Sequence, residues 1–303
     1  MTSPHPESAV LDLMRQVWTK GSERRDRTGV GTRALFGALL RFDLSDGSVP
    51  LLTTKRVFWK SAVKELVWFL DGQTNIKPLV EQGVHIWTDW PMERHRTATG
   101  ETLTRDEFEA RILSDEGFAA EWGELGPVYG KQWRRWLGPD GNTHDQIEAL
   151  LHSLKQNPAS RRHIFTGWNV AELGQMALPP CHMTYQYFVE PRSDGPDRLY
   201  GILYQRSCDL GLGFPFNIFE AALLVRMLAD QCGYAPGEIV WMGADVHLYL
   251  NHSHLVETML ARDPRPFPTL SLAPAPSLFD YRLEHVRLTG YDPHPAIAAP
   301  VAV

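Results

Sequence analysis

The spacing of apolar residues predicts several helices. Ser8–Lys20 and Phe58–Leu70 carry apolar residues every three or four positions, and a glycine ends each run, as is typical of amphipathic helices. The same spacing predicts a helix over His144–Gln156, which must end before Pro158. Phe216–Cys232 is apolar on almost every side, which predicts a buried helix.

Other segments are typical of strands. Ala34–Phe42 is rich in strand formers, and Met183–Glu190 and Leu199–Gln205 alternate aromatic and β-branched residues on either side of a Pro/Gly/Asp-rich turn. Glu238–Met242 predicts a further, short strand. Because these helices and strands do not follow a regular βαβ order, the pattern favours an α+β fold over a doubly wound sheet.

The remaining segments complete a single domain over residues 1–303. Met92–Glu124 is charged and rich in threonine, and we interpret it as a small, mostly helical insertion. Asn251–Arg262 predicts a helix with Asn251 as its cap. Gly290–Val303 is rich in proline and alanine, which excludes a helix there.

Composition narrows the class of protein. With 303 residues, 43% hydrophobic and 22% charged, the chain can fill a sizeable core, and a net charge of -6 argues against nucleic acid or acidic membranes as general partners. No apolar run is long enough to span a bilayer. Three cysteines without a CxxC pair predict neither a disulfide framework nor a metal site, so we expect a cytoplasmic protein.

Cys181 is a candidate nucleophile. A lone cysteine is most often a small buried hydrophobe, but the preceding Pro179-Pro180 fixes a rigid backbone that presents the thiol at a defined angle. A thiol needs a nearby cation to be substantially ionised at neutral pH. Cys208 and Cys232 are better interpreted as structural.

Four arginines are candidate cations. Each could be a solvated surface charge, but each lies in or beside a predicted loop with Gly, Ser or Thr nearby, which suggests an anion site. Guanidinium groups grip the three oxygens of a phosphate monoester. The glycines do not form a nucleotide-triphosphate loop. The arginines are Arg27, Arg161, Arg162 and Arg206, the last followed by Ser207.

Further polar and aromatic residues leave two interpretations open. Asn217 is either a helix cap or a reader of a planar ligand that presents a donor and an acceptor side by side. His247 and Tyr249, two apart on an extended segment, either bind one hydroxyl together or pack together. Trp87 and Trp90 suit the core or stacking on a flat heterocycle.

In their order along the chain, these residues resemble the folate-dependent thymidylate synthase family, from about residue 8 to the last residue, interrupted by the segment 92–124. The motifs are Asp26-Arg27-Thr28-Gly29, Gly126-Pro127-Val128-Tyr129-Gly130, Ser160-Arg161-Arg162, Pro180-Cys181-His182, Gln205-Arg206-Ser207-Cys208-Asp209, Phe216-Asn217-Ile218, Asp245-Val246-His247-Leu248-Tyr249, and Tyr291-Asp292-Pro293 with the final Ala299-Pro300-Val301-Ala302-Val303.

The resemblance implies an α+β fold around a large twisted mixed sheet with surrounding helices, packed sheet to sheet in a homodimer. It implies conversion of dUMP to dTMP, with 5,10-methylenetetrahydrofolate as co-substrate and neither metal nor flavin. In the nucleotide site that the resemblance implies, Cys181 is the nucleophile toward uracil C6. The phosphate would be bound by Arg206, Arg27 and Ser207 together with the partner's Arg161 and Arg162. Asn217 and Asp209 would bind the base, and His247 and Tyr249 the ribose.

The resemblance also implies a folate and proton-transfer half. Glu65 would organise a water relay, with Tyr129 and His182 nearby. Trp87, Trp90, Asp209, Gly213 and the Val303 carboxylate would bind the folate.

Two departures from the family pattern concern this half: Thr88 replaces a common acid, and Glu220 places a carboxyl one turn after Asn217. The nearest alternative activity is a pyrimidine-nucleotide hydroxymethylase on the same fold, which adds water instead of hydride. Trp87 and the closing tail favour the synthase because both exclude water. A non-catalytic nucleotide- or RNA-binding protein is the other alternative, and Cys181 with its arginines argues against it.

Overall fold

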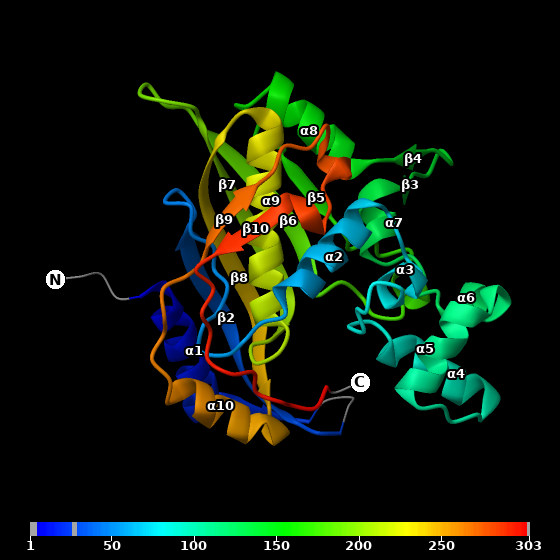
Figure 1. The fold of residues 1–303 in the computed structure, drawn as a ribbon. Coiled ribbons are helices and arrows are strands. Elements are labelled where there is room, and N and C mark those ends of the chain that lie inside the picture. Colours follow the sequence, from blue (N-terminus) through cyan, green and yellow to red (C-terminus); the bar gives the residue numbers. More distant parts are fainter. Residues whose placement is uncertain (1–4, 26–28, 302–303) are drawn as a thin grey trace.

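The computed structural model describes residues 5–25 and 29–301, and a six-stranded sheet organises them (Figure 1). The strand order is β1-β2-β8-β7-β6-β5, and every neighbouring pair is antiparallel except β7 and β8. The fold is therefore α+β with a mixed sheet, as predicted. The strands are β1 (Ser22–Arg24), β2 (Thr32–Asp43), β5 (Ile164–Thr166), β6 (His182–Glu190), β7 (Arg198–Asp209) and β8 (Ala235–Tyr249).

Helix α9 (Phe214–Cys232) connects the parallel strands β7 and β8 and runs along one face of the sheet (Figure 1). A parallel pair requires such a crossover. Gly201 on β7 permits the close approach, since a β-carbon there would lie 2.7 Å from Val225 Cγ2 of α9. The helix is buried along most of its length, as its composition predicted. Its first turn therefore has a fixed position beside the ends of β7 and β8.

The other predicted helices are present, with small shifts at their ends. The helix predicted from His144 starts at Gln146, because the Asp145 carboxylate caps it by accepting hydrogen bonds from Ile147 N and Glu148 N at 3.0 and 2.9 Å. The helices of the main body are α1 (Pro6–Lys20), α2 (Trp59–Leu70), α3 (Lys77–Val80), α7 (Tyr129–Arg134), α8 (Gln146–Gln156) and α10 (Ser253–Leu260), with 3₁₀ turns η1 (Leu173–Gln175), η2 (Leu250–His252), η3 (Leu278–Asp280) and η4 (Leu283–His285).

Two predictions in the C-terminal third need correction. The strand predicted at Glu238–Met242 is present, but it is part of the 15-residue β8, whose pairing with both β2 and β7 extends it past Gly243 and Asp245, residues that are poor strand formers. Asn251 is not a helix cap: it lies in the 3₁₀ turn η2, and α10 starts two residues later. The short strands that were not predicted include β1, β3 (Trp136–Leu137) with β4 (Thr143–His144), and β9 (Thr269–Leu272) with β10 (Val286–Thr289).

The segment 92–124 is mostly helical. Its helices α4 (Asp89–Thr99), α5 (Arg105–Ser114) and α6 (Glu116–Trp122), called here the three-helix segment, lie together away from the sheet (Figure 1). They have a small core of their own, in which the buried His95 ring contacts the rings of Phe108, Phe118 and Trp122. That it is an insertion into the family pattern remains a prediction.

The described part of the C-terminal tail, 290–301, contains neither helix nor strand. Hydrogen bonds fix its course: Tyr291 Oη donates to Leu52 O at 3.0 Å, and His252 Nε2 lies 2.9 Å from Pro300 O. The tail thereby returns to the N-terminus of α9. Of the helices in the described residues, none is long and apolar enough to cross a membrane.

Candidate active site

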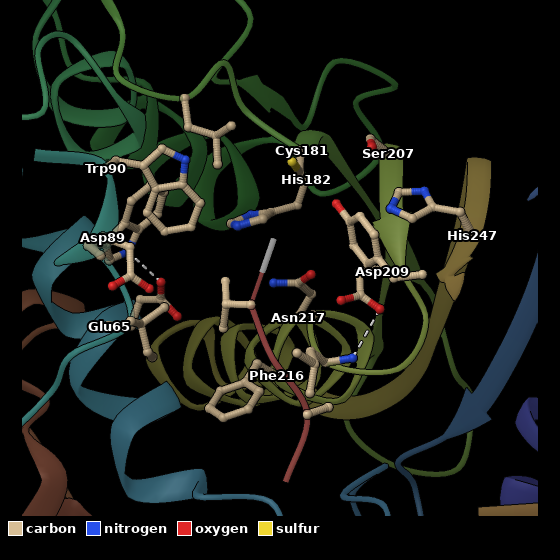
Figure 2. Close-up of a pocket in the computed structure, with 18 of the residues that line it drawn as sticks. Glu65, Asp89, Trp90, Cys181, His182, Ser207, Asp209, Phe216, Asn217 and His247 are labelled. Carbon is tan, nitrogen blue, oxygen red and sulfur yellow. Dashed lines mark hydrogen bonds between the residues drawn. The ribbon is translucent and has the colours of Figure 1, made fainter. Parts of the chain in front are cut away.

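A cavity of about 930 Å³ opens between α2, α9, the ends of β7 and β8, and the tail. Figure 2 shows Glu65 and Trp90 on one side of it, Cys181 and His247 on the other, and Asn217 between them on α9. Most of the predicted site residues line this single cavity: Glu65, Trp87, Trp90, Tyr129, Cys181, His182, Arg206, Ser207, Asp209, Gly213, Asn217, His247 and Tyr249.

Four predicted residues do not belong to this set. Arg161 and Arg162 are exposed, and neither lines the cavity. Arg161 instead borders a separate groove of about 320 Å³ beside Phe188 and Ile202. Arg27 and Val303 lie outside the described residues.

Cys181 and Arg206 lie together in the wall of the cavity. Cys181 precedes β6, and Arg206 Nη2 lies 3.9 Å from its sulfur. The same guanidinium donates to the carbonyls of Pro179 and Pro180 at 2.6 and 2.8 Å. The rigid Pro-Pro segment therefore fixes the positions of both the thiol and the guanidinium. A neighbouring cation favours the thiolate form of a cysteine.

Tyr129 and His182 form a buried polar layer behind the thiol. Tyr129 Oη accepts a hydrogen bond from Cys181 N at 2.7 Å, and its ring stacks on His182 with the ring centroids 4.3 Å apart. Burial raises the pKa of Tyr129 well above its usual value and lowers that of His182 to about 3. At neutral pH the phenol is therefore protonated and the imidazole neutral.

Asn217 lines the cavity and is not the cap of its helix. Helix α9 starts at Phe214, so Asn217 is its fourth residue, and Oδ1 accepts a hydrogen bond from Gln205 Nε2 at 2.9 Å. Gln205 Oε1 in turn accepts from Trp241 Nε1 at 2.8 Å. An indole nitrogen can only donate, which fixes the orientation of both amides. The Asn217 NH₂ group is left to donate into the cavity, and Oδ1 retains a second lone pair.

His247 and Tyr249 both line the cavity, and their rings are in contact, with centroids 5.5 Å apart, so the two side chains do pack together. That they bind one hydroxyl stays a prediction. His247 Nδ1 lies 3.1 Å from Asp245 Oδ1, and Arg24 Nη1 donates to Asp245 Oδ2 at 2.5 Å. The hydrogen bond with His247, together with the charge of Arg24, lowers the pKa of Asp245. The imidazole is thus oriented by a carboxylate.

Asp209 is fixed at the end of β7. Its Oδ1 accepts hydrogen bonds from Gly211 N and Leu212 N at 2.8 and 3.2 Å (Figure 2). The buried Lys55 amine donates to Gly211 O at 2.5 Å, and burial lowers the pKa of this lysine to about 8 against the opposing charge of Asp209.

Glu65 and Glu220 form a buried carboxyl pair between α2 and α9. The two groups are hydrogen-bonded to each other, and Trp87 Nε1 donates to Glu65 Oε1 at 2.6 Å. Burial raises the pKa of both, and the charge of Glu65 raises that of Glu220 further. Burial and the repulsion between the two charges therefore favour one proton shared by the pair, with Glu220 favoured as its holder. The Glu220 carboxyl thus lies beside Glu65.

Sequence reasoning missed Gln205, Lys55 and Arg24 as parts of the site. Gln205 stands directly before Arg206 in one of the family motifs, and an amide on the inward side of a buried strand was the signal for it. Lys55 and Arg24 carried no such signal, because their roles depend on contacts with Gly211 and Asp245, which are far away in the sequence.

The geometry of the cavity by itself indicates a class of protein, an enzyme that bonds covalently to its substrate. A thiol beside a guanidinium, an oriented carboxamide and a pair of indoles suit covalent chemistry on a planar anionic ligand with a second flat ligand beside it. In the described residues, no group of three or more His, Cys, Asp or Glu side chains is placed to hold a metal ion.

Comparison with known proteins identifies the family. The thymidylate synthase family model matches residues 8–303. The chain is 63% identical to a thymidylate synthase of Rhizorhabdus wittichii and 61% identical to one of Cereibacter sphaeroides, in each case over 99% of both chains. It is 57% identical to a thymidylate synthase of Zymomonas mobilis, over 98% of this chain and 99% of the relative. The chain belongs to the thymidylate synthase family.

Proposed function

We propose that this chain is a methyltransferase that converts dUMP to dTMP by reductive methylation with 5,10-methylenetetrahydrofolate, releasing dihydrofolate. The placement of Cys181 next to Arg206, in one cavity with Asn217 and the two indoles, carries the proposal. Family membership and the names of relatives at 57–63% identity support it. At about 930 Å³ the cavity is near the upper end of the range for ligand sites, about 300–1,000 Å³, which leaves room for two ligands.

The nucleotide half of the cavity comprises Cys181, β7 from Gln205 to Asp209, Asn217, and His247 with Tyr249. Cys181 attacks C6 of uracil, which makes C5 nucleophilic and divides a difficult alkylation into easier steps. Arg206 and Ser207 bind the phosphate, together with Arg27. His247 and Tyr249 hold the ribose hydroxyl.

Asn217 selects uracil over cytosine. Its NH₂ group donates to O4 and its Oδ1 accepts from N3–H, whereas cytosine presents an amino group and a bare nitrogen at these positions. The chain Trp241–Gln205–Asn217 prevents the amide from turning over to suit cytosine. A buried mismatch of this kind is costly because a donor then faces a donor.

The folate half comprises Glu65, Trp87, Trp90, Gly213 and the tail. The bound folate supplies the one-carbon unit and the hydride. Trp87 and Trp90 have ring centroids 5.3 Å apart with their planes tilted by 47°, and they provide an apolar wall, while the Asp209 carboxylate binds the pterin. The tail, whose residues Ile297, Ala299 and Val301 line the cavity, excludes water from the reacting carbon.

Proton transfer is assigned to the buried polar residues. Glu65, a carboxylate held by Trp87, organises a water relay at the base. The neutral His182 and the protonated Tyr129 stabilise the thiol-bearing loop and accept or donate hydrogen bonds without carrying charge.

We further propose a homodimer formed sheet to sheet. The face of the sheet opposite α9 exposes large apolar side chains, with Leu39 52% and Phe188 60% exposed. An exposed apolar patch of this kind is unusual unless a partner covers it. Ile202, Tyr204 and Met242 extend the same patch. A second copy of this chain would cover it and bring its Arg161 and Arg162 to the phosphate.

The shared site has a direct test. Cys181→Ala and Arg162→Ala subunits, each inactive alone, should regain partial activity when mixed, because one hybrid site receives both intact halves. If no activity returns after subunit exchange has been verified, each chain builds its own phosphate site.

The reaction is tested by its products. Incubation with dUMP and 5,10-methylenetetrahydrofolate should give dTMP and dihydrofolate by mass spectrometry. If 5-hydroxymethyl-dUMP and tetrahydrofolate are the main products, the hydroxymethylase alternative is right.

A cytoplasmic location is the last part of the proposal. All three cysteines carry thiols rather than disulfides, which supports a reducing compartment. Under this proposal the chain meets its two substrates, the reduced folate and the nucleotide, in the cytoplasm.

A further inference from the structure

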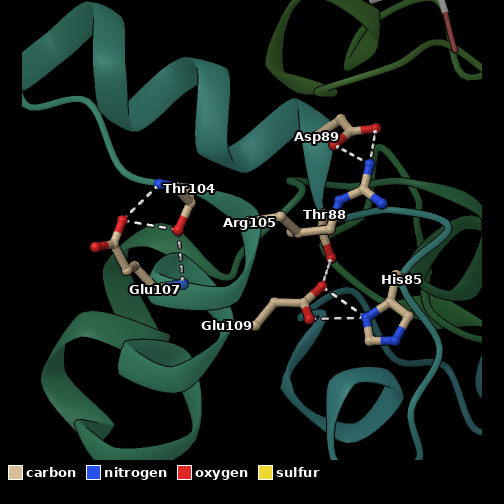
Figure 3. Close-up of polar contacts among 7 residues, drawn as sticks. All are labelled: His85, Thr88, Asp89, Thr104, Arg105, Glu107 and Glu109. Atoms are coloured by element: carbon tan, nitrogen blue, oxygen red, sulfur yellow. Dashed lines mark hydrogen bonds and ion pairs between the residues drawn. The ribbon is translucent and has the colours of Figure 1, made fainter. Parts of the chain in front are cut away.

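Within the three-helix segment, helix α5 contacts the loop and first turn, residues 85–90, that carry Trp87 and Trp90. Figure 3 shows these contacts. Glu109 of α5 accepts a hydrogen bond from Thr88 Oγ1 at 2.6 Å, and its two carboxylate oxygens lie 2.9 and 2.7 Å from His85 Nδ1. Arg105 Nη2 contacts both oxygens of the Asp89 carboxylate at 2.8 and 2.9 Å.

The two side chains are presented by one face of α5. Thr104 caps the helix: its Oγ1 accepts from Glu107 N at 3.3 Å, while Thr104 N donates to the Glu107 carboxylate at 2.8 Å. This reciprocal cap fixes where the helix starts. Arg105 and Glu109 are then four residues apart and lie on the same side. The helix can therefore hold both ends of the segment 85–90 at once.

The held segment lines the cavity. His85, Trp87, Asp89, Trp90 and Arg105 border it, whereas Glu109 does not. Within the segment, Trp87 reaches across to the Glu65 carboxylate. The contacts made by α5 therefore help to fix the positions of the two indoles and, through Trp87, of Glu65.

Burial distinguishes the contact of Glu109 with Thr88 from an ordinary surface pair, whereas Arg105 in its pair with Asp89 is half exposed. Glu109 is 6% exposed and Thr88 1%, so the carboxylate has exchanged water for these partners. A buried charged acceptor holds its donors more tightly than an exposed one does. Thr88 stands where the family pattern has an acid, and Glu109 brings a carboxylate to that hydroxyl from the three-helix segment.

We propose that Glu109 and Arg105 are positioning residues, through which the three-helix segment holds Trp87 and Trp90 in the stacking geometry that the folate requires. The inference rests on the proposed function and assigns the segment a role in folate binding but none in dUMP binding. Neither residue transfers a proton or touches the reacting atoms.

The test compares Glu109→Gln, Glu109→Leu and Arg105→Met with the unaltered chain. Glu109→Leu removes both contacts of the carboxylate and should raise the KM for 5,10-methylenetetrahydrofolate by about tenfold or more, because a displaced binding wall loses orientation. Glu109→Gln keeps an acceptor for Thr88 and should restore most of the affinity. Arg105→Met should raise the KM by about threefold.

Two readouts separate positioning from a merely structural role. Folic acid binding, measured by calorimetry with dUMP present, should weaken in parallel with the KM, whereas the Kd for dUMP should stay within about twofold. The fraction of 5-hydroxymethyl-dUMP among the products should rise, since a loosened wall admits water.

The control is Arg111→Met. Arg111 also belongs to α5, pairs with Glu101 at 3.2 Å and lies 4.2 Å from the Phe118 ring centroid, but it does not contact the segment 85–90. Arg111→Met should lower the stability of the three-helix segment without changing the affinity for folate.

The outcomes are distinct. If the unaltered chain makes no dTMP, the proposed function fails. If it makes dTMP while Glu109→Leu and Arg105→Met bind folate normally, or lose dUMP binding equally, the positioning role is wrong. Should Glu109→Leu not fold, Arg105→Met decides by the same criteria.

Discussion

In the nucleotide half of the cavity most polar side chains come from neighbouring positions on two paired strands, to which Cys181 and Asn217 are added. In the folate half they come from segments far apart in the sequence. Gln205 to Asp209 follow one another on β7, and Asp245, His247 and Tyr249 alternate on β8. The sheet register then fixes their relative positions, with Ser207 opposite Asp245 and Asp209 opposite His247.

The folate half has no such template. Glu65 belongs to α2, Trp87 and Trp90 lie near the start of α4, and the tail arrives from the end of the chain. Hydrogen bonds between residues about 20 or more positions apart, from Thr88 to Glu109 and from Trp87 to Glu65, take the place of strand pairing. The comparison indicates that the nucleotide half is preformed, while the folate half depends on side-chain contacts that single substitutions can break.

The largest effect is expected from the nucleophile of the preformed half. Cys181→Ala should lower turnover by about a thousandfold or more, because no other group can form the bond to uracil C6. The Kd for dUMP should change little, as the sheet still presents the other ligands. Cys208→Ala and Cys232→Ala are the matched controls and should keep most of the activity; comparable turnover in the Cys181 variant would refute the covalent mechanism.

A large effect is also expected in the folate half. Trp87→Gly removes one of the two indoles and the donor to Glu65, and should slow dTMP formation by about tenfold to a hundredfold while 5-hydroxymethyl-dUMP appears. Product analysis by mass spectrometry measures both. Unchanged products would mean that Trp87 is core packing only.

Base selection tests whether the amide chain is as rigid as the nucleotide half requires. Asn217→Asp should move preference from dUMP toward dCMP, since a protonated acid can form hydrogen bonds with the cytosine edge.

Gln205→Leu frees the Asn217 amide to turn over and should reduce discrimination between dUMP and dCMP by about tenfold to a hundredfold in kcat/KM. Gln231→Leu, an amide that bonds Ala275 O outside the cavity, is the control. If Gln205→Leu discriminates as well as the parent, the base is read elsewhere.

The smallest effect concerns the proton shared by Glu65 and Glu220. Burial raises the pKa of Glu220 above its usual 4.5, so the folded chain holds a proton that the unfolded chain releases. The contribution of Glu220 to the free energy of unfolding is fully present below its unfolded pKa of 4.5. It is lost as the pH rises toward the folded pKa, by up to about 1.4 kcal/mol per pH unit. Glu220→Gln removes the proton but keeps a donor for Glu65, so its free energy of unfolding should depend less on pH above about 5.

Denaturant unfolding at fixed protein concentration, from about pH 5 to about pH 9, measures this dependence. Glu220→Leu, which lacks the donor, separates the loss of the hydrogen bond from the loss of the proton. Parallel pH curves for the parent and Glu220→Gln would show that Glu220 does not hold the proton.

The same contrast explains what the sequence could predict. The order of helices and the polar residues of the nucleotide half are local patterns, so Cys181, Arg206, Asn217 and His247 could be selected together from the sequence alone. The length of β8 could not, because its ends are strands only through pairing with β2 and β7. Nor could the role of Glu109, since it depends on the contact with Thr88 that the fold creates.

The origin of the methyl hydrogens tests the central claim most directly. The chain is incubated with dUMP and 5,10-methylenetetrahydrofolate deuterated on its reduced pterin ring, and the nucleotide product is weighed by mass spectrometry. The account predicts dTMP with one deuterium in its methyl group, because the folate remains in the closed cavity as the reductant. A hydroxymethyl product without the label would contradict it and would show that water reaches the reacting carbon first.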